Sequence, residues 1–208
     1  MASNFDLSIV TTVYNDEAIV APLVQEIVSV VSSMNIEYEI ILVNDSSSDK
    51  SEDAIKNACD KNTCVKGISL SRNFGQQIAM SAGIAHSSGK YVLIMDGDLQ
   101  NPPSEIPNFY STITKNGRDI IYGVSKKRNN FWDEFTSNLF WYILTVIFKV
   151  KIVRNQLMMK IMTRKFIDRY NLYQEVSRTV SGILQDISAN HEIIEIQNYP
   201  QIFGLYWI

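Results

Sequence analysis

The sequence has few of the residues on which several classes of protein depend. Of 208 residues only two are cysteines and two are histidines, and their positions form no ligand pattern for a soft metal: Cys59, Cys64, His86 and His191. Acidic residues outnumber basic ones by 22 to 19, and no run of lysine and arginine suggests a surface for nucleic acid. We therefore expect no zinc cluster and no nucleic-acid partner, and the low cysteine content fits a reducing cytosol.

Long apolar segments are also missing. Residues 1–15 lack a basic start followed by an apolar core, so we expect a cytoplasmic protein rather than a secreted one. The most apolar stretch, 139–148, is shorter than the roughly 20 residues needed to span a bilayer. Two interpretations of the aromatic and basic segment 131–152 remain open: a core helix that covers the sheet, or an interfacial helix at the cytoplasmic face of a membrane.

What the chain does contain is a regular alternation of apolar segments. Runs rich in β-branched residues predict strands at 7–13, 38–44, 65–71, 91–96 and 119–124. Apolar residues at helical spacing predict helices between them, one through Ile19, Leu23, Val24, Ile27, Val28 and Val31, and another through Ile78, Ala82 and Ala85. This order predicts an α/β fold, a mostly parallel sheet flanked by helices, in a single domain.

Polar residues collect where the predicted strands end. They lie at 14–16, 44–49, 71–75 and 96–98, and in such folds the carboxyl ends of the strands form the ligand site. After the fourth strand, Asp96 and Asp98 stand two residues apart with Gly97 between them, which lets a ligand approach the backbone. Two neighbouring carboxylates repel each other unless a cation lies between them. Mg²⁺ or Mn²⁺ would take these oxygens together with substrate phosphates, and Gln100 offers one more oxygen.

These segments together resemble the family-2 glycosyltransferases. The similar motifs are Val13-Tyr14-Asn15-Asp16, the run Val43 to Asp49, the run Leu70 to Gln76, the run Met95 to Pro103, and Tyr122-Gly123. They occur in the family's order over about residues 5 to 165, and the branch that the chain resembles most is that of dolichol-phosphate mannose synthase and the bacterial polyprenyl-phosphate sugar transferases. The resemblance implies a GT-A fold, a nucleotide-diphosphate sugar donor, a divalent metal and inversion at the anomeric carbon.

The resemblance also implies roles for individual residues. Asp96 and Asp98 would be the catalytic pair, and the metal would be held by Asp96, Asp98 and Gln100. Nucleotide-sugar binding would involve Thr12, Tyr14, Asp16, Asp45, Arg72 and Asp96. Two of these have alternatives: Asp45 could cap a helix, and Arg72 could be a surface residue or pair with a carboxylate rather than bind phosphate.

One departure from the family bears on the acceptor. Relatives commonly carry Gly-Asp-Phe-Arg where this chain has 157–160, so that Met158 stands in place of an aspartate that could act as a base. An ionised lipid phosphate needs no such base, which favours a polyprenyl or dolichyl phosphate acceptor. A saccharide hydroxyl would need another carboxylate, such as Glu175 or Asp186.

We therefore expect a glycosyltransferase with a nucleotide-sugar-binding part at 1–125 and a helical, acceptor-side and membrane-proximal region at 126–208. Its acceptor would be a lipid phosphate or a growing cell-surface polysaccharide. A homo-oligomer, a membrane partner subunit and peripheral membrane contact remain open. The alternative from another class is a catalytically weak nucleotide-sugar-binding protein or partner subunit.

Overall fold

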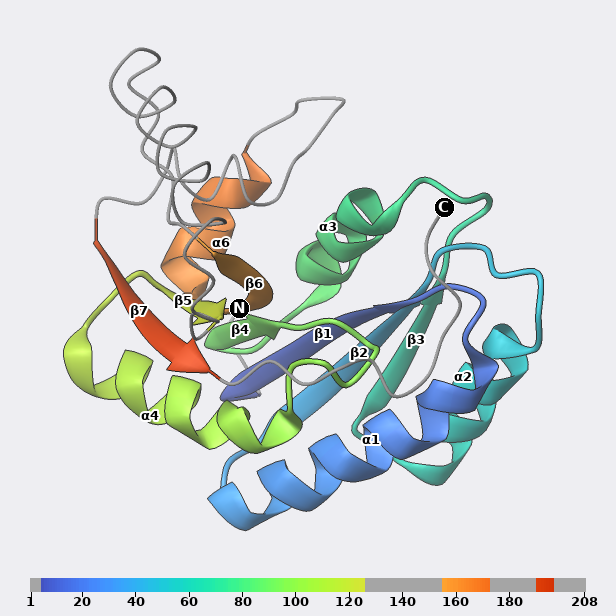
Figure 1. Cartoon of the computed structure of the whole chain (residues 1–208), viewed down its shortest axis with the longest axis horizontal. Coiled ribbons are helices and arrows are strands. Elements are labelled where there is room, and N and C mark those ends of the chain that lie inside the picture. Colours follow the sequence, from blue (N-terminus) through green and yellow to red (C-terminus); the bar gives the residue numbers. More distant parts are fainter. Residues whose placement is uncertain (1–4, 126–154, 173–189, 197–208) are drawn as a thin grey trace, which may run out of the picture.

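Seven strands form one sheet in the order β3-β2-β1-β4-β6-β5-β7 (Figure 1). The computed structural model describes residues 5–125, 155–172 and 190–196. Within them the strands are β1 (Leu7–Val13), β2 (Tyr38–Asn44), β3 (Val65–Ser69), β4 (Tyr91–Ile94), β5 (Ile120–Ser125), β6 (Gln156–Thr163) and β7 (His191–Ile196). The helices are α1 (Glu17–Val31), α2 (Ser51–Lys61), α3 (Gln76–His86), α4 (Ile106–Asn116) and α6 (Arg164–Asn171), with short 3₁₀ turns η1 (Ser32–Met34) and η2 (Pro103–Glu105).

The predicted strands are all present. The strands at 7–13 and 38–44 match β1 and β2 residue for residue, whereas β3 ends at Ser69, β4 ends at Ile94 and β5 is displaced by one residue. β1 pairs in parallel with β2 and β4, and β2 pairs in parallel with β3. Of the strands that the structure describes, only β6 runs against the others, so the sheet is mostly parallel, as predicted.

β6 and β7 correct the expectation of a helical region at 126–208. Its described residues include α6, but 156–163 pairs antiparallel with both β4 and β5, and 191–196 adds an outer parallel strand beside β5. The segment QLMMKIMT is rich in residues with high helix propensity. Its place between two strands overrides that propensity, because pairing and burial decide strand formation more than intrinsic preference does.

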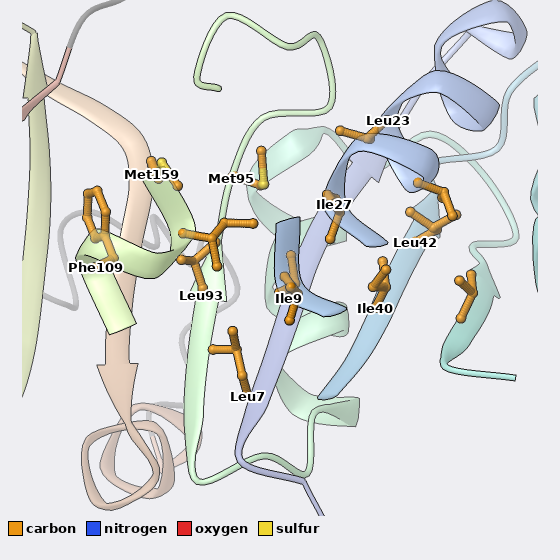
Figure 2. Packing of buried hydrophobic residues seen from close by; sticks show 14 of the residues in the cluster. Leu7, Ile9, Leu23, Ile27, Ile40, Leu42, Leu93, Met95, Phe109 and Met159 are labelled. Carbon is orange, nitrogen blue, oxygen red and sulfur yellow. The ribbon is translucent and has the colours of Figure 1, made fainter. Parts of the chain in front are cut away.

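Helices cover both faces of the sheet (Figure 1). One face packs against α1, α2 and α4 through a cluster that includes Leu23, Ile27 and Phe109, and Figure 2 shows these side chains against Ile9 and Leu93. The other face packs against α3 and α6. The segment Glu17–Met34 is long and apolar enough to cross a membrane by length and composition alone. Its apolar stripe nevertheless lies on the sheet, which is the arrangement of a core helix.

The residues that indicated helix α3 are mostly not the ones that it buries. The helix exists, but Ile78 and Ala85 are exposed, and the residues that face the sheet are Ala79, Met80, Ser81, Gly83 and Ile84. Gly83 explains which residues of α3 are buried, because it allows the helix backbone to approach β1 and β2 closely. A Cβ added there would lie 2.3 Å from Val10 Cγ1 and 2.9 Å from Val43 Cγ2.

Gly83→Val should therefore destabilise the protein by about 1–3 kcal/mol, because the new side chain must push α3 away from the sheet. Urea unfolding would measure the loss. Ala85→Val, at an exposed position of the same helix, is the matched control and should change stability little. Equal stability of the two variants would contradict this account of the packing.

A polar cluster lies at the amino-terminal ends of β1 and β2. The Glu39 side chain is fully buried, and its Oε1 accepts hydrogen bonds from Ser8 Oγ (2.6 Å), Ser88 N (2.7 Å) and Ser88 Oγ (2.8 Å). Its Oε2 lies 2.6 Å from Lys66 Nζ. These bonds join β1, β2, β3 and the turn before β4, at the edge of the sheet opposite the strand ends that carry the predicted site.

Candidate functional site

The loops after β1 and β2 are tied together at the carboxyl edge of the sheet. Asn15 N donates to Ser47 Oγ (3.0 Å) and Asn15 Oδ1 accepts from Ser48 N (2.7 Å). Asp16 N donates to Ser51 Oγ (3.1 Å). Asn15 and Ser46 both have positive φ values, so each loop turns sharply where its strand ends. The two loops form one surface, which holds the predicted residues Tyr14 and Asp16 half-buried at this edge.

Asp45 fixes the loop after β3. Its side chain is 1% exposed, and its two carboxylate oxygens accept hydrogen bonds from the main-chain N–H groups of Phe74 and Gly75, each at 2.9 Å. Gly75 has a φ of +89°, a conformation that favours glycine, and it directly precedes α3. Asp45 therefore positions the start of α3, while its predicted contact with a nucleotide base stays a prediction.

Asp96 is held from two sides. Gln76 Nε2, at the start of α3, donates to Asp96 Oδ1 (2.8 Å), and Asn101 Nδ2 donates to Asp96 Oδ2 (3.2 Å). Gly97 brings the loop close to β1, because a Cβ there would lie 2.7 Å from the carbonyl oxygen of Thr12. Sequence reasoning assigned no role to Gln76 or Asn101, although both belong to the motifs that carried the resemblance.

The carboxylates at this edge disfavour one another's ionised forms. Burial, and then the neighbouring Asp98 carboxylate, raise the pKa of Asp96 to about 6. Burial raises the pKa of Asp98 as well, against the hydrogen bond from Gln100 N to Asp98 Oδ1 (3.0 Å). Burial followed by the charges of Asp49 and Asp98 raises the pKa of Asp16. The structure thus brings the predicted acidic residues together and creates a site of negative potential that favours a cation.

The donor atoms fit a hard divalent cation that shares its coordination with a substrate. Within 5–125, 155–172 and 190–196, no three histidine, cysteine, aspartate or glutamate side chains form a metal-binding group. A closed structural site is therefore not built from these residues. Mg²⁺ and Mn²⁺ are commonly held by one or two carboxylates plus phosphate oxygens, and Asp96 and Asp98 match that requirement. Asn101 Oδ1, buried and without a hydrogen-bond partner among the described residues, is a further oxygen beside the pair.

The other residues predicted to bind the donor or the metal lie at the same edge. Thr12 is half-buried near the end of β1, and Gln100 is half-buried after Asp98. Arg72 is exposed after β3, with its guanidinium carbon 4.6 Å from the centre of the Phe74 ring. Met158 is half-buried on β6, whereas Glu175, Asp186 and the segment 131–152 lie outside the described residues.

One residue of the site escaped sequence reasoning altogether. Lys160 of β6 is 1% exposed, and its positive charge opposes the rise in the pKa of Asp96 that burial and the Asp98 carboxylate cause. The available signal was a lysine inside the apolar run LMMKIMT, because lysine is almost never fully buried without a counter-charge.

The sequence is similar to those of known proteins of one family. The model described as Glycosyl transferase family 2 matches residues 8–194. The chain is similar to an uncharacterized glycosyltransferase of Synechocystis sp., with 31% identity over 208 residues that cover 97% of this chain and 65% of the relative. It is also similar to dodecaprenyl-phosphate galacturonate synthase of Rhizobium johnstonii, with 31% identity over 196 residues that cover 93% of this chain and 58% of the relative. The chain thus spans less than two thirds of the length of these curated relatives.

Among solved structures, a mannosyltransferase from Pyrobaculum calidifontis in complex with GDP-Man and Mn²⁺ has a similar fold. The TM-score is 0.61 at 14% identity, over 92% of this chain and 55% of that chain. At this identity the likeness shows the fold alone. The fold it shows is the one expected from the sequence.

Proposed function

Because the chain belongs to glycosyl transferase family 2 and has the GT-A fold, we propose that it transfers a sugar from a nucleoside-diphosphate donor to a polyprenyl phosphate, with inversion. The observation that carries the proposal is the pair Asp96 and Asp98, held at the carboxyl edge of the sheet among loops tied to one another. The name of the dodecaprenyl-phosphate relative supports the choice of acceptor.

Each loop residue would have a part in binding the donor. Tyr14 and Asp16, on the joined β1 and β2 loops, would line the base and ribose, and Thr12 and Arg72 flank the same edge. Asp45 would act through the loop that it holds before α3. Asp96 and Asp98 would hold Mg²⁺ or Mn²⁺ together with the diphosphate, and Gln100 would contribute through its side-chain oxygen. When bound, the cation supplies positive charge that stabilises the leaving diphosphate.

The transfer itself requires no proton acceptor when the acceptor is a phosphate. A phosphate oxygen of the lipid attacks the anomeric carbon, and the bond from that carbon to the donor diphosphate breaks, its electron pair leaving with the nucleoside diphosphate. A phosphate monoester carries charge near neutral pH, since its second pKa is about 6. Met158, whose thioether cannot accept a proton at this pH, is compatible with such an acceptor and unfavourable for a saccharide hydroxyl.

We predict that polyprenyl phosphate is a better acceptor than any free saccharide, and that Met158→Asp gives little gain with the lipid. The measurement is product formation from each acceptor with one radiolabelled nucleotide sugar, repeated over a panel of donors. Efficient transfer to a saccharide with none to the lipid phosphate would contradict the proposed acceptor.

A second candidate function is donor binding without efficient transfer, which Met158 favours because the expected base is lost. Nucleotide-sugar binding by calorimetry with no product from any donor and acceptor pair would support this alternative.

Action on a lipid phosphate would place the protein at the cytoplasmic face of a membrane. Flotation with anionic liposomes would test that location.

A further inference from the structure

Lys160 is a charged residue in the interior of the sheet. Its side chain is 1% exposed, and it pairs with Ile94 of β4 on one side and with Tyr122 of β5 on the other. Ile94 and Tyr122 belong to the apolar cluster under α3 and α6, so the lysine stem lies in the same layer. A buried ammonium group is costly unless a negative charge lies nearby to compensate it.

The negative charge is supplied by Asp96. It lies two residues beyond Ile94, the cross-strand neighbour of Lys160, and side chains two residues apart in extended backbone point to the same face. Such a diagonal neighbour is within reach of a long side chain. Burial lowers the pKa of Lys160 to about 8, and the Asp96 charge opposes that shift. Burial and the Asp98 carboxylate raise the pKa of Asp96 to about 6, and the Lys160 charge opposes that shift.

A metal ion bound by Asp96 and Asp98 would change this balance. Gln76 and Asn101 orient the Asp96 oxygens but are neutral, so without a metal Lys160 is, among the described residues, the positive group that acts on Asp96. Once a divalent cation occupies the carboxylates, the ammonium group that acts on Asp96 also acts on a like charge bound there. Lys160 would therefore favour the empty site and oppose the loaded one.

We propose that Lys160 is a built-in counter-ion of Asp96, a positioning residue that keeps the site assembled while no metal is bound and keeps a bound metal exchangeable. The inference rests on the proposed function only for the identity of the metal site. An exchangeable ion suits an enzyme whose product carries away the diphosphate that completes the coordination.

The test compares Lys160→Met with wild-type protein by two readouts that need no turnover: Mn²⁺ titration by calorimetry, and thermal unfolding with and without Mn²⁺, both near neutral pH. Lys160→Met should bind Mn²⁺ more tightly, by roughly tenfold for the loss of one like charge. Its melting temperature should fall in the absence of Mn²⁺ and recover when Mn²⁺ is added. Lys160→Arg, which keeps the charge, should bind Mn²⁺ as wild-type protein does.

The matched control is Met162→Ala, which changes a buried residue on the same face of the same strand. It should lower the melting temperature equally with and without Mn²⁺.

A Lys160→Met chain that unfolds without Mn²⁺ and folds with it would support the proposal, and one that fails to fold in either condition would contradict it. Unchanged or weaker Mn²⁺ binding by Lys160→Met, or tighter binding by Lys160→Arg, would also overturn it. Wild-type protein that binds no Mn²⁺ would overturn the metal site itself, whereas failure of sugar transfer alone would leave the result for Lys160 intact.

Discussion

Asp98→Ala should weaken Mn²⁺-dependent binding of a nucleoside diphosphate by about a hundredfold or more while the protein stays folded. Removing a group that only supports a metal ligand typically costs about 10- to 100-fold in metal affinity. Removing a ligand itself should cost more. Asp98 is half-buried, and burial raises its pKa. Its ionised form is therefore disfavoured when no metal is bound, and removal of the carboxylate should not destabilise the fold.

Calorimetry of GDP and UDP with and without Mn²⁺ is the measurement, with thermal unfolding as the check on the fold. Asp53→Ala is the matched control, because Asp53 is an exposed aspartate on α2. It should bind as wild-type protein does. If wild-type protein bound the nucleotides equally well with and without Mn²⁺, or if Asp98→Ala kept the Mn²⁺ dependence, the metal role of the pair would be wrong.

Glu39→Ala should destabilise the protein by about 2–4 kcal/mol, because it removes the acceptor of several hydrogen bonds to a buried charge. The variant would deprive Ser8 Oγ and the N–H and O–H groups of Ser88 of their acceptor at this edge of the sheet. Ser8 Oγ also accepts from Gly89 N (2.8 Å), so the loss would reach the turn before β4. Urea unfolding of the variant and of Glu37→Ala measures the effect. Glu37 is exposed two residues earlier in the chain, and its replacement should change the free energy of unfolding by less than about 0.5 kcal/mol.

The contribution of Glu39 should also depend on pH. Burial raises the pKa of Glu39, but hydrogen bonds from Lys66, Ser8 and Ser88 outweigh burial and hold it below its ordinary value of 4.5. The folded protein therefore favours the ionised form, and the stabilisation is present above pH 4.5 and lost as the pH falls through the lower folded pKa. The stability gap between wild type and Glu39→Ala should narrow on acidification, and a gap that widened would contradict the assignment.

The edge of the sheet that carries the site could be predicted because its signals are local. Runs such as LSIVTTV and YEIILVN are apolar throughout, as strands buried on both faces must be, and polar residues follow each of them. Parallel strands bring their carboxyl ends to one edge, so Asp16, Asp45 and Asp96 were expected to gather there before any contact was known. The spacing of Asp96, Gly97 and Asp98 pointed to a cation for the same local reason.

The contacts that tune this site could not be predicted, because each joins segments far apart in the chain. Gln76 reaches Asp96 across 20 residues, and Asp45 reaches the N–H of Gly75 across 30. The buried face of α3 does not follow from apolar spacing either, because the close approach of the helix to the sheet selects Gly83.

The sequence by itself determined the alternation of strands and helices, the family, and the set of polar residues at one edge, since all of these follow from composition and short motifs. Only the tertiary structure decided that 156–163 is a strand between β4 and β5, because its residues have helix propensity and are held extended by two neighbouring strands. That placement also pairs Lys160 with Ile94, two residues before Asp96. The charge balance of the site thus depends on a pairing between residues more than sixty positions apart, which no local pattern in the chain encodes.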